Sequence, residues 1–163
     1  VLMGESFNNP DETAERALKC AGVWDKVSSL SNGINTIMTK EFDNDGAVLS
    51  GGEQQKIVVA RAFAQQASVK VFDEPSSALD PIAEYDLYKG IMDESKGHIT
   101  LFISHRLSSV KDADEVFMLE NGAVIEQGTH RELMDMGGKY CEMFTKQAQN
   151  YLADETYREG VTA

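Results

Sequence analysis

The stretch V-L-S-G-G-E-Q-Q-K-I-V-V-A-R-A, residues 48–62, decides the fold of this chain. Ser50 and Glu53 have the S-x-x-E spacing of a capping box, which marks the start of a helix. The nearly continuous apolar run from Ile57 to Ala64 is typical of a helix that packs inside a protein. The pattern therefore predicts a helix over residues 50–66 that is buried on most of its sides.

The start of this helix also has the composition of an anion site. Gly51 and Gly52 stand just inside it, and residues without a side chain let ligand oxygens approach the exposed backbone N–H groups. The helix dipole and the Ser50 hydroxyl add to the attraction. An isolated S-G-G is more often a flexible helix cap, so the hypothesis needs support from the rest of the chain.

Downstream of this helix the sequence predicts a strand, a helix and a second strand. Residues 69–72 and 99–103 are short, mainly apolar runs rich in β-branched and aromatic residues, which Lys70 interrupts in the first. Between them Asp80 precedes Pro81, which indicates a capped helix to about residue 92. A strand, a crossover helix and another apolar strand form a βαβ unit, so we expect a parallel pair of strands buried on both faces.

Three ionisable side chains follow the ends of these strands. Asp73 and Glu74 end the first strand, and His105 comes directly after the second. Ligands of open α/β sheets bind at this edge, where an Asp holds Mg²⁺, a Glu activates water and a His donates to a phosphate oxygen. Taken alone, Asp-Glu-Pro more often ends a strand with a turn, and a lone His is more often structural.

The remaining patterns predict short elements on either side. Ala14, Ala17, Leu18 and Ala21 recur at helical spacing and indicate a helix over residues 10–21. The other expected elements are a short helix at 23–30, an extended piece at 34–38 in a polar loop, a hairpin of 116–119 with 124–127 around Asn121-Gly122, a short helix opened by the Thr129/Glu132 capping box, and a helix at 140–151 before a polar tail.

Charge and composition exclude some functions. The chain has 163 residues, and its 15 basic against 27 acidic residues give a net charge of −12, which argues against nucleic-acid binding. No stretch approaches the roughly 20 apolar residues of a membrane span. Cys20 and Cys141 lack the spacing of a metal site, so a reduced, cytosolic protein is the default expectation.

Taken together, the motifs resemble one known family in their order and spacing. Residues 48–62 resemble the signature motif and helix of an ATP-binding-cassette (ABC) nucleotide-binding domain. V-K-V-F-D-E-P-S-S-A-L-D, residues 69–80, resembles its Walker B motif and D-loop, and I-S-H-R-L, residues 103–107, resembles its H-loop. L-S-N-G-I-N-T at 30–36, G-T-H-R-E-L-M at 128–134 and Y-C-E-M-F-T-K-Q-A at 140–148 are similar to the exporter branch.

The resemblance implies an α/β fold of the P-loop NTPase class, present in part. Residues 1–66 would form a helical subdomain that ends in the signature helix, residues 67–138 the C-terminal part of the ATPase core, and residues 139–163 a C-terminal helix and tail. The phosphate-binding string G-x-x-x-x-G-K-[ST] does not occur, since Tyr140 follows Gly138-Lys139, the single Gly-Lys pair. We therefore expect the P-loop upstream in a parent ABC ATPase, and no activity from this chain alone.

The resemblance also assigns roles to residues, in a dimer that holds ATP head to tail between two such domains. Asp73 would hold Mg²⁺, Glu74 would polarise the attacking water and His105 would steady the γ-phosphate. The residues expected to bind the γ-phosphate of the partner's ATP are Ser50, Gly51, Gly52 and Glu53. The residues expected to form the D-loop at the dimer interface are Ser77, Ala78, Leu79 and Asp80.

The expected partners are a second nucleotide-binding domain, in a homo- or heterodimer, and a transmembrane domain, fused upstream or separate. The chain would lie at the cytoplasmic side of a membrane and drive transport, in the export direction, without binding nucleic acid. Two alternatives stay open. The chain could be a truncated, non-catalytic subunit that gives its signature face to a partner, or the ATPase of an importer or of a soluble ABC protein.

Overall fold

The structure is a computed structural model that describes residues 1–2, 7–38 and 46–159, with only the backbone for residue 108 and residues 150–159. The chain divides into two compact units, Val1–Ile103 and Ser104–Ala163, which we describe one at a time as the first and the second unit. The division into three parts at residues 66 and 138 stays a prediction.

The first unit contains four α-helices, one short 3₁₀ helix and two strands among its described residues. In chain order they are α1 (Pro10–Cys20), α2 (Trp24–Ser28), the 3₁₀ helix η1 (Gly33–Asn35), α3 (Gly51–Ala64), β1 (Val69–Asp73), α4 (Pro81–Glu94) and β2 (Ile99–Ile103). The two strands are parallel, with Val69 opposite Ile99 and Asp73 opposite Ile103. The predicted βαβ unit, with α4 as its crossover helix, is confirmed.

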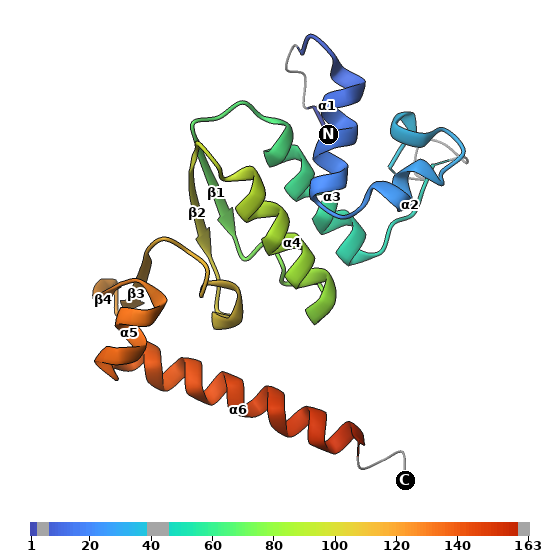
Figure 1. The fold of residues 1–163 in the computed structure, drawn as a ribbon. Coiled ribbons are helices and arrows are strands. Elements are labelled where there is room, and N and C mark those ends of the chain that lie inside the picture. Colours follow the sequence, from blue (N-terminus) through green and yellow to red (C-terminus); the bar gives the residue numbers. More distant parts are fainter. Residues whose placement is uncertain (3–6, 39–45, 160–163) are drawn as a thin grey trace. The chain divides into compact units, whose positions relative to one another are not determined.

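Helices α1, α3 and α4 lie on one side of the β1–β2 pair and enclose the core with it (Figure 1). Each large apolar side chain buried there contributes about 1.5–3 kcal/mol of stability. The helices approach closely at Gly90, where an added Cβ would run into the carbonyl group of Cys20. The main buried side chains are Ala17, Leu18, Val59, Ala60, Phe63, Phe72, Leu87 and Ile91.

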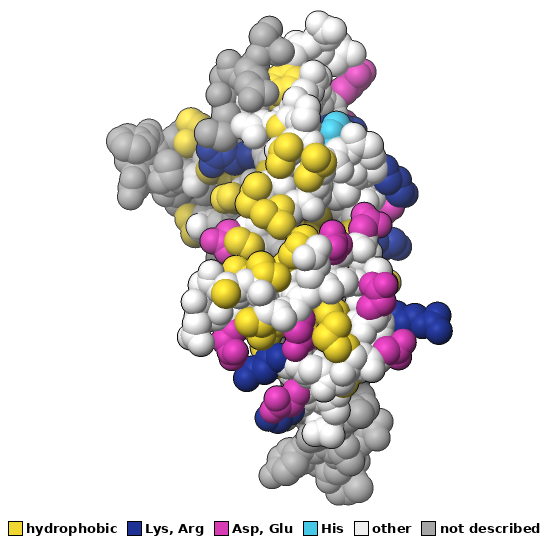
Figure 2. Space-filling view, turned by 90° about the vertical axis from the view of Figure 1, so that its left-hand side faces the viewer, with side chains coloured by type: hydrophobic (Ala, Val, Ile, Leu, Met, Phe, Trp, Pro, Cys, Tyr) yellow, Lys and Arg dark blue, Asp and Glu magenta, His cyan; other side chains and the backbone are white. Residues whose placement is uncertain are grey.

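The other face of the strand pair is exposed, which contradicts the expectation of strands buried on both faces. Val71 is 59% exposed and Ile99 is 68% exposed. The side of the unit on which β1 and β2 lie carries a gathering of hydrophobic side chains (Figure 2). Of the β1 residues, Lys70 and Phe72 are the buried ones and point to the covered side. Burial lowers the pKa of Lys70, and the nearby charge of Glu94 offsets part of that shift.

Helix α3 is less buried than expected. Ser50 and Glu53 form the predicted capping box, but the buried residues are confined to Val59, Ala60, Phe63 and Ala64, and Val58 is 58% exposed. The helix therefore buries one face, because its packing partners lie on one side only.

The loop before α3 also departs from the prediction. Residues 33–35 form the short helix η1, so the extended piece expected at 34–38 begins only at Thr36. Part of this predicted loop, residues 39–45, lies outside the described residues.

The second unit contains η2 (Leu107–Ser109), β3 (Val116–Glu120), β4 (Ala123–Gly128), α5 (His130–Met136) and α6 (Lys139–Glu159). The hairpin and the capping box of Thr129 and Glu132 are as predicted. Asn121 and Gly122 have φ of 49° and 78°, the positive values that a tight hairpin turn requires.

Helix α6 runs to Glu159, whereas the sequence predicted its end near residue 151 and a polar tail. The segment L-A-D-E-T-Y-R-E at 152–159 contains no Gly or Pro, and several of its residues are good helix formers, so polarity alone did not end the helix. Among the described residues, the chain has no helix with the length and apolar character that crossing a membrane demands.

Candidate functional site

The start of α3 has the capping box that the sequence predicts. The backbone N–H of Ser50 donates to Glu53 Oε2 at 2.8 Å, and the N–H of Glu53 donates to Ser50 Oγ at 3.3 Å. The first N–H groups of a helix have no partner within the helix, and the capping box uses those of Ser50 and Glu53. The N–H groups of Gly51 and Gly52, at the same end, are those that a bound phosphate would meet.

Glu53 sets the charge at this helix start. The hydrogen bond from the backbone of Ser50 lowers the pKa of the Glu53 carboxyl group, with Lys26 adding a smaller effect. Lys26 Nζ lies 3.6 Å from Glu53 Oε1 and partly offsets the carboxylate charge. An anion here would therefore be held by backbone N–H groups and the helix dipole, next to the Lys26–Glu53 ion pair.

Gly52 allows the loop after β1 to pack against the start of α3. A Cβ added at Gly52 would lie 3.1 Å from Leu79 Cδ2 and 3.3 Å from the carbonyl oxygen of Ala78. A Cβ added at Gly51 would meet nothing within 4 Å. Gly52 thus lies in a close contact that an added Cβ would tighten, while Gly51 faces open space.

We expect Gly52→Ala to be less stable than Gly51→Ala by about 1 kcal/mol or more, because overpacking a tight contact typically costs about 1–3 kcal/mol and both variants gain the same helix propensity. The matched variant Gly51→Ala adds the same methyl group to open space, so its free energy of unfolding should stay at or above that of the parent chain. Chemical denaturation of both variants measures the difference. Equal stabilities would contradict the packing role of Gly52.

Gln55 joins α3 to the loop that follows β1, and the sequence patterns did not single it out. Its Nε2 donates to Ser77 Oγ at 2.9 Å and to the carbonyl oxygen of Glu74 at 3.2 Å, and its Oε1 accepts from the N–H of Ala78 at 2.8 Å. Gln55 stands three residues after Gly52 and so lies on the same face of the helix. That spacing was the one sequence signal that could have pointed to Gln55.

Asp73 and Glu74 lie exposed at the C-terminal edge of the strand pair, as predicted. The N–H of Glu74 donates to the carbonyl oxygen of Ile103 at 3.0 Å, so Glu74 continues the pairing one residue beyond β1. Glu74 has φ of +44°, a left-handed conformation that costs about 1–3 kcal/mol in a residue other than glycine. Such strain is frequent at functional sites, which supports a chemical role for this carboxylate.

The predicted D-loop residues 77–80 connect this edge to α4. Asp80 caps α4, and its Oδ1 accepts from the N–H groups of Ile82 and Ala83, each at 3.0 Å. These hydrogen bonds, that of Ala83 first, lower the pKa of the Asp80 carboxyl group. Directly before the loop, the buried Ser76 hydroxyl donates to Glu84 Oε1 at 3.1 Å. Hydrogen bonds therefore hold the loop in place at both of its ends, Ser76 and Asp80.

His105 belongs to the second unit and follows the last residue of β2 by two positions. Its side chain is exposed, and its backbone carbonyl accepts a hydrogen bond from Gln147 Nε2 at 2.7 Å. The turn that contains it is closed by the N–H of Arg106, which donates to Ser104 Oγ at 3.0 Å.

The residues fit a magnesium ion that is bound together with a nucleotide. Among the described residues, no group of three or more His, Cys, Asp or Glu is placed to hold a metal. Mg²⁺ in nucleotide sites is usually held by one or two carboxylates, substrate phosphates and water, rather than by a cage of protein ligands. The exposed carboxylate of Asp73 at the strand edge would be a ligand of that kind.

Comparison with known proteins gives a consistent result. A family model described as "ABC transporter" matches residues 4–77. The ATP-dependent lipid A-core flippase of Alcanivorax borkumensis is 35% identical over 144 residues, which is 88% of this chain and 24% of the relative. The flippase of the same name from Burkholderia pseudomallei strain 1710b is 37% identical over 138 residues, 85% of this chain and 22% of the relative.

A solved structure, that of a bacterial Atm1-family ABC exporter with ATP bound, matches with a TM-score of 0.72 and 33% identity. The match covers 84% of this chain and 23% of that chain. The chain thus spans about a quarter of the length of these relatives.

Proposed function

Because this chain belongs to the ABC transporter family, as part of an exporter-like nucleotide-binding domain, we propose that it works in the ATP-hydrolysing domain of a membrane exporter. The structural observation that carries the proposal is the set of contacts between the start of α3 and the loop after β1. Gly52 packs against that loop, which follows Asp73 and Glu74, and Gln55 forms hydrogen bonds to it.

In this proposal each domain serves two nucleotides of a head-to-tail dimer. The strand edge with Asp73 and Glu74 faces the ATP bound by its own domain, and the start of α3 faces the ATP of the partner. The contacts of Gly52 and Gln55 keep the distance between the strand edge and the start of α3 fixed. Closing the dimer therefore brings both onto their phosphates at the same time. A closed site excludes water, which strengthens the electrostatic interactions inside it.

The chemical roles follow from the side chains. When bound, Mg²⁺ neutralises charge on the phosphates. Asp73 holds the ion through its carboxylate. Glu74 accepts a proton from the water that attacks the γ-phosphate, and the imidazole of His105 hydrogen-bonds to a γ-phosphate oxygen. Ser50, with the N–H groups of the two glycines after it, stabilises the same phosphate from across the dimer.

The coupling to transport follows from differential binding. ATP favours the closed dimer, and hydrolysis removes that preference, so a transmembrane partner alternates between two conformations. The names of the relatives and of the solved structure support export as the direction. We place the chain at the cytoplasmic face of the membrane, beside a second nucleotide-binding domain and a transmembrane domain.

We also propose a second function, in which the native subunit itself lacks the string G-x-x-x-x-G-K-[ST], as these 163 residues do. The chain would then lend its α3 face to a partner that carries the phosphate-binding loop. The mass of the polypeptide isolated from the native source by affinity purification distinguishes the two functions. A longer chain that contains the P-loop favours the first function, whereas a chain of this length that co-purifies with a P-loop-bearing chain favours the second.

Asp73 provides the test of the proposed site. In the complete transporter, Asp73→Asn should raise the Mg²⁺ concentration for half-maximal ATP hydrolysis by at least about tenfold, since even residues behind a metal ligand affect affinity by that factor. Asp86→Asn, the same change at an exposed position of α4, should leave the Mg²⁺ dependence unaltered. An unaltered Mg²⁺ dependence in Asp73→Asn would remove this carboxylate from the metal site.

A further inference from the structure

We propose that Gln147 of α6 is a positioning residue, whose side-chain amide holds the backbone directly after the His105 side chain, at the carbonyl group of His105 and the N–H of Leu107, and so fixes where the imidazole lies. The inference rests on the proposed function, in which His105 contacts the γ-phosphate. It assigns to the C-terminal helix a part in catalysis that none of the sequence motifs indicates.

The contact uses both ends of the amide. Gln147 Nε2 donates to the carbonyl oxygen of His105 at 2.7 Å, and Gln147 Oε1 accepts from the N–H of Leu107 at 2.8 Å. The two bonds join residues that are 42 and 40 positions apart in the chain. Gln147 is half-buried and Leu107 is only 5% exposed, so these two hydrogen bonds, which we call the Gln147 clamp, are partly shielded from water.

The amide group suits this task because it donates and accepts at the same time. A carboxylate at the same place would accept from Leu107 but would not donate to the carbonyl group of His105. An apolar side chain of the same length would do neither. The loss of either bond leaves a backbone group that must find another partner.

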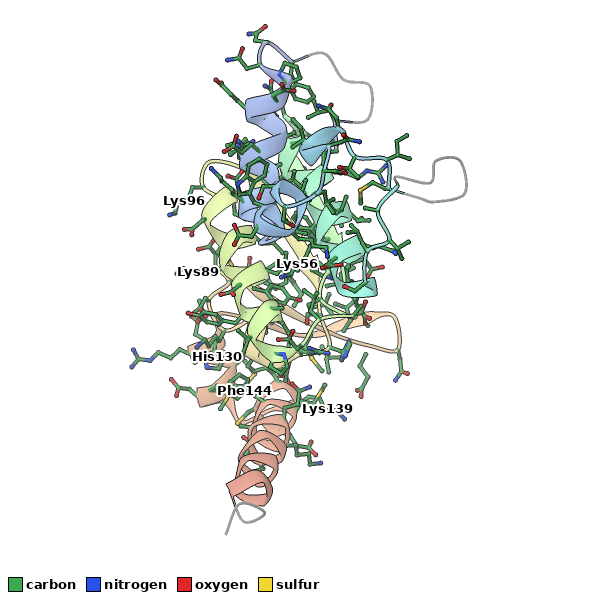
Figure 3. All side chains as sticks on the ribbon, turned by 90° about the vertical axis from the view of Figure 1, so that its right-hand side faces the viewer. Lys56, Lys89, Lys96, His130, Lys139 and Phe144 are labelled. Carbon is green, nitrogen blue, oxygen red and sulfur yellow. The ribbon has the colours of Figure 1, made fainter. Side chains whose placement is uncertain are left out.

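Helix α6 is anchored firmly enough to serve as a support. Its first turn carries Tyr140, which is fully buried, and the N–H of Tyr140 donates to Glu126 Oε2 at 3.0 Å. The Tyr140 hydroxyl lies 2.8 Å from His130 Nδ1. His130 also packs on Phe144, with 4.7 Å between ring centroids (Figure 3). Gln147 stands seven residues after Tyr140, two turns along the same face of the helix.

The turn itself is closed by short-range bonds. The Ser109 hydroxyl donates to the carbonyl oxygen of Arg106 at 2.6 Å, and the N–H of Arg106 donates to Ser104 Oγ at 3.0 Å. These bonds shape the turn, and Gln147 fixes the turn to α6. Without the clamp the turn keeps its shape but loses its position, and a displacement of about 1 Å is enough to slow an enzymatic step by about 100-fold.

The test measures ATP hydrolysis by the complete transporter. Gln147→Met keeps the length of the side chain and removes both bonds, so kcat should fall by about tenfold or more while KM for ATP stays nearly constant. Gln149→Met makes the same change at an exposed position of the same helix and should have no effect.

Gln147→Glu gives a second readout that loss of packing alone would not produce. A protonated carboxyl group donates and accepts like the amide, whereas the carboxylate only accepts. The ratio of its kcat to that of the parent should therefore rise as the pH is lowered, and the ratio for Gln147→Met should stay flat. The Leu107 amide should also exchange hydrogen faster in Gln147→Met, with the β4 amides as an unchanged internal reference.

The outcomes separate the two proposals. If His105→Ala impairs turnover but Gln147→Met does not, the positioning role is wrong and the proposed function stands. Equal losses in Gln147→Met and Gln149→Met, or an unchanged Leu107 exchange rate, also overturn the positioning role. If His105→Ala hydrolyses ATP at the parent rate, the catalytic role of His105 fails, and the role of Gln147 fails with it.

Discussion

Glu74→Gln should lower kcat for ATP hydrolysis by the complete transporter by about 100- to 10,000-fold, the range that a positioned general base contributes. Glutamine has the shape of glutamate and keeps the backbone contacts of the strand edge, but it does not take a proton from water. ATP binding should stay close to that of the parent, because the substitution leaves the phosphate contacts in place. Steady-state kinetics and nucleotide binding at equilibrium measure both quantities.

Glu12→Gln, the same change at an exposed position of α1, is the matched control and should leave kcat unaltered. Turnover by Glu74→Gln near the parent rate would remove Glu74 from the role of base. The strained φ of +44° would then have to be explained by the shape of the loop alone.

Ser50→Arg should abolish ATP-driven dimerisation of the nucleotide-binding domain while leaving the monomer folded. The long side chain would fill the space at the start of α3 where we expect the partner's γ-phosphate. The loss of the helix cap should cost about 1 kcal/mol of folding free energy, which a stable domain tolerates. Sedimentation with and without ATP, in the Glu74→Gln background that keeps ATP intact, measures the dimer.

Ser50→Ala separates the two effects of this substitution. It removes the same helix cap without filling the site, so it should lose similar stability and keep a larger share of the ATP-dependent dimer. A full dimer in Ser50→Arg would contradict the assignment of α3 to a site shared between subunits.

The elements that local signals specify were predictable from the sequence. The capping box of Ser50 and Glu53, the Asp80-Pro81 helix start and the Asn121-Gly122 turn each depend on a few neighbouring residues, and the structure has all three. The parallel pairing of β1 and β2 followed from the order of strand, helix and strand.

The contacts that organise the candidate site were not predictable in the same way. Gln55 and Gln147 look like ordinary polar helix residues, and their roles arise from loops that are 19 to 42 positions away in the chain. Both lie within segments that resemble the family, residues 48–62 and 140–148, but that resemblance assigns no role to their side-chain amides. The geometry of the backbone groups that it meets was needed to identify both residues.

Burial was the least predictable property. The apolar runs of β1 and β2 predict strands that are covered on both faces, but Val71 and Leu101 lie on an exposed face. An apolar run records that a strand is suited to burial, and it does not say which element covers each face.

The most direct measurement is equilibrium dialysis of Mg-ATP, at millimolar nucleotide, against this 163-residue chain alone. The central claim is that the chain supplies the water-activating strand edge and the α3 face, and that a P-loop outside these residues grips the phosphates. That claim predicts no detectable binding. Stoichiometric binding that disappears in Asp73→Ala would contradict it, because these residues would then form a complete nucleotide site by themselves.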